Sequence, residues 1–302
     1  MDANIRRRVL GKSLRMMASA HLTRLWSYLD GVWSEEQPVG NVNRRWFGSC
    51  VDGDQMVAVV NNTAGRVYCK LDGTWAEHQP AGDFDKYWMG ASIHKGQIIV
   101  SIENSIDGRL YSYDGASWVE EQPAGNVNRN WRPVAINNGQ MIAGVNATTG
   151  RLYSKLSGSW VEERPAGNVD RVWWSADINN GQMIATSRSL TNGRVYSNLS
   201  GTWVDEQPAG NVNSNWGCCS INNGQMMAGN TTRLYSKLNG VWVEEQPAGN
   251  VNRDWAGCAI YDDILLAGVW NGRLYYKYDG VWEEMQPSGN TNRFWPSVSI
   301  SK

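Results

Sequence analysis

Asparagine, arginine and tryptophan recur together along this 302-residue chain in a pattern suited to binding a ligand. One copy reads Gly-Asn-Val-Asn-Arg-Asn-Trp over residues 125–131. Amide and guanidinium groups bind hydroxyls, and an indole face stacks on the apolar side of a sugar ring. An alternative for the same residues is structural, with the indoles wedged into the core and the asparagines capping turns. The predicted ligand-binding residues in four copies are Asn41, Asn43, Arg44, Trp46, Asn126, Asn128, Arg129, Trp131, Asn168, Arg171, Trp173, Asn250, Asn252, Arg253 and Trp255.

Other chemically active residue types are present, but they are not spaced as a metal site would need. His21, His78 and His94 occupy unrelated positions, and the five cysteines lack the C-x-x-C spacing typical of zinc sites. Adjacent glutamates such as Glu120 and Glu121 point to opposite faces of a strand, so a pair does not chelate calcium. We expect one member of each pair to contact an arginine or lysine of a neighbouring repeat. No metal and no cofactor is predicted.

A longer motif, W-x-E-x-Q-P-x-G-[ND]-x-[ND]-x-x-W, recurs seven times with small departures and a spacing of 39 to 43 residues. It contains fourteen of the 17 tryptophans, and the others are Trp26, Trp174 and Trp270. The repeat therefore accounts for most of the unusual composition. Its first tryptophans are Trp33, Trp75, Trp118, Trp160, Trp203, Trp242 and Trp282, and its second are Trp46, Trp88, Trp131, Trp173, Trp216, Trp255 and Trp295.

Each repeat has the length and the turn signals of four short strands. In the unit that begins at Trp131, the expected strands are 134–136, 140–145, 151–154 and 159–163, with an Asn-Asn-Gly hairpin turn between the first two. Four strands in about 40 residues match one blade of a β-propeller. Helical repeats of this period would need amphipathic runs of about 10 residues, and none is present. The fold class predicted is therefore all-β, a seven-bladed propeller.

The two ends of the chain are expected to share one blade. Residues 16–26 resemble residues 226–235, which form the second and third strands of another unit, whereas residues 297–300 read as a first strand that lacks its partners. A C-terminal strand that completes the N-terminal blade would close the ring and pair both free edges. The predicted propeller domain is 15–302.

Residues 1–14 match no part of the repeat and form a predicted basic extension. Five cations and one acid give residues 1–15 a charge of +4, which leaves −5 on the remainder because the whole chain carries −1. Such an arm on a closed ring is typical of a tether to an acidic protein surface or nucleic acid, and a solubilising tail is the alternative. The predicted docking residues are Arg6, Arg7, Arg8 and Lys12.

Composition narrows the expected partners and compartment. The net charge of −1 gives no overall attraction to nucleic acid or to an anionic membrane, and no stretch has the length of a membrane-spanning helix. Lys12 and Arg15 interrupt what would be the apolar core of a secretion signal, so none is predicted. Unpaired cysteines indicate folding in a reducing cytoplasm.

The turn before the first tryptophan resembles a known family. Residues 153–160 read Tyr-Ser-x-x-x-Gly-x-Trp, which is similar to a degenerate Asp-box of sialidase-type (BNR) propellers. Asp30, Asp72, Asp114 and Asp279 carry the acid, whereas Ser157, Ser200 and Asn239 depart from it. Over residues 15–302 the repeat is also similar to Asp-box-like proteins encoded by bacteriophages and environmental bacteria. The resemblance implies a propeller, with the Asp-box as a structural turn.

We predict that the chain is not an enzyme. Sialidases use an arginine cluster, a tyrosine–glutamate pair and an acidic aspartate. Here the arginines fall in one slot of the repeat, as blade parts would, and unit length varies too little to insert a separate active site. The arginines in this slot are Arg24, Arg66, Arg109, Arg151, Arg194, Arg233 and Arg273.

The predicted function is a non-catalytic interaction protein of a bacteriophage particle, in a tail, fibre or capsid, docked on other virion proteins by the basic arm. Its location would be the virion, after folding in the host cytoplasm. A soluble multivalent lectin for cell-surface glycans is the alternative, and a sialidase-like glycosidase is the third. The loops between second and third strands vary most, and Trp270 there is predicted either to anchor a partner or to be partly buried.

Overall fold

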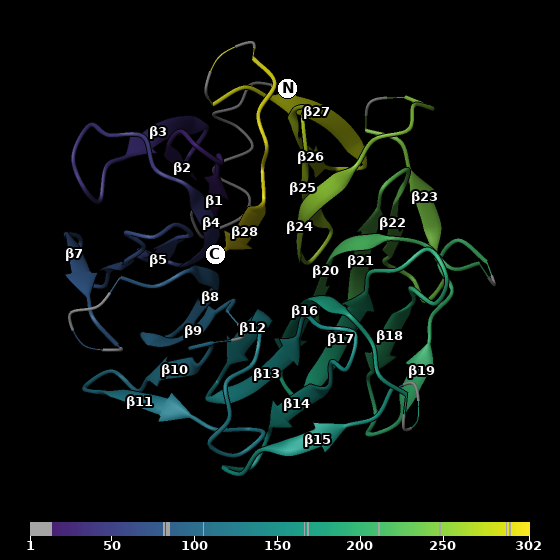
Figure 1. The fold of residues 1–302 in the computed structure, drawn as a ribbon. Helices are drawn as coiled ribbons and strands as arrows, with labels where there is room; N and C mark the ends of the chain where they lie inside the picture. The colour runs from purple at the N-terminus through teal and green to yellow at the C-terminus, as the bar shows by residue number, and fades with distance from the viewer. Residues whose placement is uncertain are drawn as a thin grey trace.

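Seven four-stranded antiparallel sheets are arranged as blades around a central axis (Figure 1). The computed structural model describes residues 14–302 apart from Ala81, Asp83, Phe84, Ser105, Ala166, Asn168, Asn211, Ala248, Ser288 and Asn290. The described chain contains no helix, and hence none long and apolar enough to cross a membrane. The prediction of an all-β, seven-bladed propeller is therefore confirmed.

Each blade has strands A to D, counted from the axis outward. Blade 1 contains β28 (Ser297–Ser301), β1 (Arg15–Ser19), β2 (Leu25–Leu29) and β3 (Val32–Glu36), and blade 2 contains β4 (Trp46–Asp52), β5 (Gln55–Val60), β6 (Val67–Lys70) and β7 (Trp75–His78). Blade 3 contains β8 (Trp88–His94), β9 (Gln97–Ile102), β10 (Leu110–Tyr113) and β11 (Trp118–Glu121), and blade 4 contains β12 (Trp131–Asn137), β13 (Gln140–Val145), β14 (Leu152–Lys155) and β15 (Val161–Glu163). Blade 5 contains β16 (Trp173–Asn179), β17 (Gln182–Ser187), β18 (Val195–Asn198) and β19 (Trp203–Asp205), and blade 6 contains β20 (Trp216–Asn222), β21 (Gln225–Asn230), β22 (Leu234–Lys237) and β23 (Val243–Glu245). Blade 7 contains β24 (Trp255–Tyr261), β25 (Ile264–Val269), β26 (Leu274–Tyr278) and β27 (Val281–Met285).

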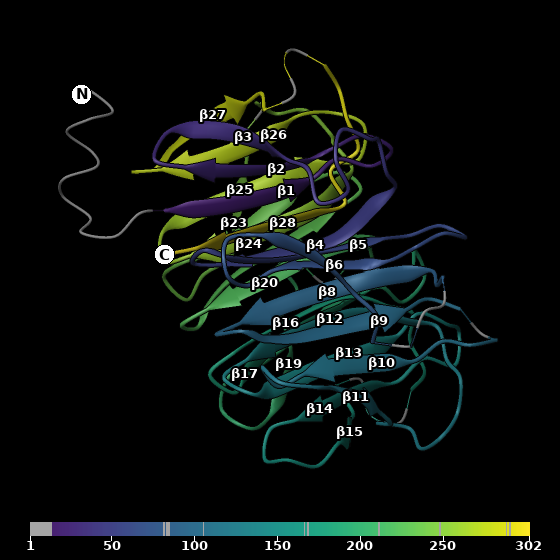
Figure 2. The ribbon, with the colours of Figure 1, turned by 90° about the vertical axis from the view of Figure 1, so that its left-hand side faces the viewer.

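The C-terminal strand closes the ring, as predicted. β28 pairs with β1 in antiparallel register, with Met17 opposite Ser299, and both views place the two strands side by side (Figures 1 and 2). β1 thereby gains a partner on each side, and blade 1 has four strands like the other six blades. The predicted docking residues Arg6, Arg7, Arg8 and Lys12 lie outside the described residues, so the tether stays a prediction.

The Asn-Asn-Gly turns have two structural roles. Asn138 and Gly139 both have positive φ (50° and 77°), as a tight hairpin between twisted strands requires. The preceding asparagine links blades, because Asn137 Oδ1 accepts a hydrogen bond from the backbone N–H of Asn180 at 3.0 Å. The inner edge of each strand A has no neighbouring strand, so side chains of the adjacent blade satisfy its N–H groups.

A carboxylate joins most neighbouring blades at the outer edge. Glu121 accepts hydrogen bonds from Ser112 of its own blade (2.8 Å) and from Lys155 (2.9 Å) and Trp160 (2.6 Å) of the next. Burial raises the pKa of Glu121, but these hydrogen bonds outweigh it and hold the pKa below its ordinary value of 4.5. This confirms that one member of an acidic pair contacts a neighbouring repeat. Equivalent carboxylates are Glu36, Glu163, Glu206 and Glu245.

Candidate binding site at the mouth of the central cavity

The innermost strands enclose a cavity of about 570 Å³ along the propeller axis. Most of the polar side chains that line it form hydrogen bonds to the neighbouring innermost strand. Ser92 Oγ on β8 accepts a hydrogen bond from Ile136 N at 3.2 Å, and Ser299 Oγ on β28 accepts one from Val51 N at 3.0 Å. The polar lining is therefore largely occupied by contacts between neighbouring strands, which leaves the ends of the cavity as candidate binding surfaces.

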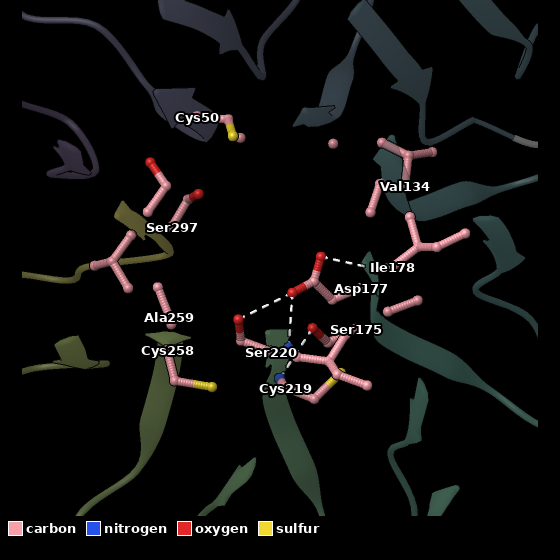
Figure 3. A pocket seen from close by; sticks show the side chains of 18 of the residues that line it. Cys50, Val134, Ser175, Asp177, Ile178, Cys219, Ser220, Cys258, Ala259 and Ser297 are labelled. Atoms are coloured by element: carbon pink, nitrogen blue, oxygen red, sulfur yellow. Dashed lines mark hydrogen bonds between the residues drawn. The ribbon is translucent and has the colours of Figure 1, made fainter. Parts of the chain in front are cut away.

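Asp177 is an acid that points into this cavity from β16 (Figure 3). Its carboxylate accepts hydrogen bonds from Ile178 N, Ile221 N and Ser220 Oγ, each at 2.9 Å. Burial raises its pKa to about 6, although these three donors oppose the shift. Burial also raises the pKa of the nearby Cys50 thiol to about 11, so this thiol is protonated near neutral pH. No group of three metal-binding side chains occurs among the described residues.

The end of the cavity at which the A strands begin is built from positions that do not repeat. The residue after each second tryptophan differs in all seven blades. A second set of positions lies at the start of the loop after strand B. In six blades the backbone N–H at this position donates to the carbonyl of the residue before the second tryptophan of the same blade, as in Arg188 to Val172 (3.0 Å) and Trp270 to Asp254 (2.7 Å). The residues after the tryptophans are Phe47, Met89, Arg132, Trp174, Gly217, Ala256 and Pro296, and those at the start of the loop after strand B, which are of six types, are His21, Asn61, Glu103, Asn146, Arg188, Thr231 and Trp270.

Five of these side chains, together with Phe294 before the last tryptophan, form an arginine–aromatic group that we call the mouth cluster. It lines a second, small cavity that shares residues with the central one. Trp270 and Phe294 lie 3.8 Å apart by ring centroid, and Phe294 meets Phe47 edge-on at 5.8 Å. Trp270 is 39% exposed, which is high for an indole already packed on another ring. The mouth cluster consists of Phe47, Arg132, Trp174, Arg188, Trp270 and Phe294.

The two arginines of the mouth cluster lie over the same indole. The guanidinium carbon of Arg132 is 3.3 Å from the Trp174 ring centroid, and Arg132 also pairs with Glu103 at 3.2 Å. Burial lowers the pKa of Arg132 to about 10, a shift that Glu103 opposes and Arg188 adds to. The Arg188 guanidinium lies 4.2 Å from Trp174 and 6.0 Å from Trp270. Cation–π contacts thus orient both arginines.

The structure separates the residues that the Asn-Arg-Trp pattern predicted as one site. Trp46, Trp131, Trp173 and Trp255 are 1–2% exposed, so the expectation that they stack on a ligand is corrected. Trp173 instead packs between blades, in one core cluster with Ile142 and Leu152 of the preceding blade. This is the structural alternative, and it follows from the large apolar area that an indole buries.

The polar members of the pattern lie at different depths. The predicted asparagines on these loops are exposed, and Asn128 donates to the carbonyl of Ile106 in a neighbouring loop. Asn168 lies outside the described residues. The arginines are half-buried, and Arg171 and Arg253 lie over the rings of Tyr196 (5.7 Å) and Tyr275 (5.9 Å). Among the described residues their Nε atoms lack a hydrogen-bond acceptor, as do those of Arg44 and Arg129. The exposed asparagines are Asn41, Asn43, Asn126, Asn128, Asn250 and Asn252.

Sequence reasoning found one member of the mouth cluster and missed the others. Trp270 was singled out because it lies outside the repeat on a variable loop. Trp174, a second tryptophan outside the repeat, was a signal of the same kind, and Arg188 joins the two. The uniform length of the repeats predicts that no separate site is inserted. The mouth needs no insertion, because unlike residues at equivalent positions of the blades form it.

The chain matches no family model and no curated protein. It is similar to solved structures of YCF48 from Cyanidioschyzon merolae (13% identity, 82% of this chain and 87% of that one, TM-score 0.55) and of YCF48 bound to D1 peptide (12%, 84% and 90%, 0.57). It is also similar to a chain of the nidogen/laminin complex (10%, 95% and 98%, 0.55). At these identities the likeness shows the β-propeller fold alone. The Asp-box resemblance stays a prediction.

Proposed function

We propose that this chain is a non-catalytic interaction module that binds a protein partner through the mouth cluster. The observation that carries the proposal is the set of unlike aromatic and arginine side chains gathered at one end of an otherwise repetitive ring. Tryptophan and arginine are the residue types most often found at the energetic centres of protein interfaces. Trp270, 39% exposed and packed against the Phe294 ring, would be the central anchor.

Two further observations support a partner over a substrate. The structurally similar YCF48 is described bound to D1 peptide, and nidogen in a complex with laminin. A sialidase would need an arginine cluster, and the arginines that recur in the repeat are the candidates for it. The Nε of Arg109 lies 3.5 Å from Glu120 Oε1 and that of Arg233 lies 3.5 Å from Glu244 Oε1, so these arginines form ion pairs within their own blades. We therefore propose that the chain is not an enzyme. Sustained turnover of a fluorogenic sialoside by the purified chain would overturn this part.

We further propose that the chain is a structural or adhesion component of a bacteriophage particle, held to other virion proteins by Arg6, Arg7, Arg8 and Lys12. This part is supported by the resemblance of the repeat and by the charge of the arm. Density-gradient centrifugation of particles from the source culture tests it. The chain should co-sediment with particles, and a variant with the four basic residues changed to glutamine should stay at the top of the gradient.

Binding of glycans by the exposed loop asparagines is the second candidate. Asn126 and Asn250 are exposed at equivalent loops, so weak sites would repeat around one face and gain avidity. A glycan array with the purified chain tests it. Binding that Asn126→Ala and Asn250→Ala together weaken, with an unchanged melting temperature, would favour the lectin. An absence of glycan binding would leave a protein partner as the remaining candidate ligand.

Site-specific photo-crosslinking tests the proposed use of the mouth. A benzoylphenylalanine replacing Trp270 should cross-link to one partner protein in the particle fraction, identified by mass spectrometry. The matched control is the same substitution at Val241, a 69% exposed residue between β22 and β23, away from the mouth cluster. Cross-links of equal yield from both positions, or none from position 270, would refute the mouth as the binding site.

A further inference from the structure

We infer that the mouth cluster recognises a carboxylate side chain of an acidic, extended segment of its partner, and that Arg188 is the residue that binds it. This inference rests on the proposed function and adds the chemistry of the partner. It is carried by the placement of Arg188, by the charges around it and by the size of the small cavity beside it.

Arg188 is held in position without using its hydrogen-bonding edge. Its backbone N–H donates to Val172 O at 3.0 Å, which fixes the start of the loop after β17. Its guanidinium lies 4.2 Å from the Trp174 ring centroid and 6.0 Å from that of Trp270, so cation–π contacts orient the group. Within the described part of the chain, the Arg188 side chain forms no hydrogen bond or ion pair. An oriented guanidinium with free N–H groups is suited to a planar carboxylate.

Neighbouring charges leave an excess of positive charge at this point. Arg132 is paired with Glu103, and Asn146 donates to the same carboxylate, so Glu103 has little capacity for Arg188. Asp254 is the remaining acid, and it lies near enough for Arg188 to influence its pKa but forms no ion pair with it within 4 Å. Arg45, next to His21, adds a third cation. At the described positions beside each second tryptophan and at the start of each loop after strand B, the three cations Arg45, Arg132 and Arg188 therefore outnumber the two acids Glu103 and Asp254.

The space beside Arg188 fits the end of a side chain. The second cavity has a volume of about 10 Å³ and is lined by Arg188, Asp254 and the rings of the mouth cluster. This space holds about one water-sized group, so one oxygen of a carboxylate can enter it, whereas a sugar ring cannot. The aromatic rim around it can pack against the apolar methylene stem of an acidic side chain and against neighbouring apolar groups of an extended segment. The favoured occupant is therefore an aspartate or glutamate within a peptide.

Fluorescence anisotropy with labelled octaglutamate, titrated with the full-length chain, tests the inference. We expect saturable binding that Arg188→Gln and Trp270→Ala each weaken about tenfold or more, as the loss of a charged hydrogen bond or of an aromatic anchor does. Asp254→Asn should strengthen binding several-fold, because it removes the acid that competes for Arg188. Labelled octaglutamine should not bind. Thermal melting of each variant checks that it is folded.

A matched control distinguishes a site from general charge attraction. Arg164 is 59% exposed on the loop after β15, and Arg164→Gln changes the net charge by the same amount as Arg188→Gln. Equal weakening by both variants would overturn the inference. So would equal binding of octaglutamine and octaglutamate, which would leave the mouth as a peptide site without selectivity for acids. If octaglutamate fails to bind while position 270 still cross-links to a partner, the inference fails and the proposed function survives.

Discussion

Replacing Glu121 with methionine should destabilise the contact between blades 3 and 4. The carboxylate is 7% exposed and accepts hydrogen bonds from Lys155 at 2.9 and 3.0 Å, from Trp160 at 2.6 Å and from Ser112 at 2.8 Å. Without it, the Lys155 ammonium and the indole N–H have no acceptor at this interface. Removing one partner of a buried ion pair in this way lowers the free energy of unfolding by about 3–5 kcal/mol.

The expected change in melting temperature follows from the size of the chain. Unfolding entropy is about 2.1 cal/mol/K per residue, or about 0.6 kcal/mol/K for a chain of 302 residues. A loss of about 3–5 kcal/mol therefore lowers the melting temperature by about 5–8 °C. Differential scanning calorimetry at pH 7 measures the shift.

The chain already contains an apolar version of this contact. Between blades 7 and 1, Met285 occupies the glutamate slot and Tyr28 the lysine slot, with Tyr28 and Trp33 at 5.4 Å in one cluster with Met285. Glu121→Met combined with Lys155→Tyr copies this arrangement, so no charge is left without a partner. We expect the double variant to recover at least half of the loss, with a coupling free energy of about 2 kcal/mol. Strictly additive losses would refute the reasoning.

Three other perturbations probe the same ring. Since hydrogen bonds hold the pKa of Glu36, Glu121, Glu206 and Glu245 low despite burial, their stabilisation is complete above about pH 4.5 and is lost as the pH falls through their folded values. Urea midpoints that are equal at pH 6 and pH 3 would contradict this. Asp177→Ser keeps an acceptor for Ile221 N, and should raise the melting temperature by a few degrees at pH 8 but not at pH 4, because burial penalises the ionised aspartate. Equal shifts at both pH values would argue against it. Removing residues 297–302 deletes β28 and uncovers the edge of β1, so cooperative melting by circular dichroism should be lost, whereas an unchanged curve would disprove ring closure.

The scaffold was predictable because its physical requirements repeat with the sequence. Each Asn-Asn-Gly turn needs two residues that tolerate positive φ, and each second tryptophan fills the same space between blades. Ring closure was predictable for the same reason, because the unpaired strands at the two ends are parts of one known unit. Whether the second tryptophans are buried between blades or exposed to a ligand was not predictable, because an indole is suited to either role.

The mouth could be predicted only in part. Its residues are unremarkable when read along the chain, since Arg132, Trp174, Arg188 and Trp270 belong to three different blades. Closure of the ring brings the equivalent positions of all the blades to one end of the axis, and only then do the unlike residues meet. The one signal in the sequence was the failure of these positions to repeat.

Outer and inner positions of the blades differ in how their residues depend on one another. At the outer contact, methionine or histidine in the glutamate slot, as at Met285 and His78, is accompanied by tyrosine in the lysine slot, as at Tyr28 and Tyr113. Glutamate is kept at Glu163 although the lysine slot there holds Asn198. A buried ammonium without a carboxylate is costly, so lysine occurs in this slot only where the glutamate is present. At the mouth, a backbone hydrogen bond fixes the loop in six of the seven blades regardless of the side chain, as Asn61, Glu103 and Arg188 illustrate. Side chains at the mouth can therefore change singly, which lets the binding surface vary while the ring that presents it stays the same.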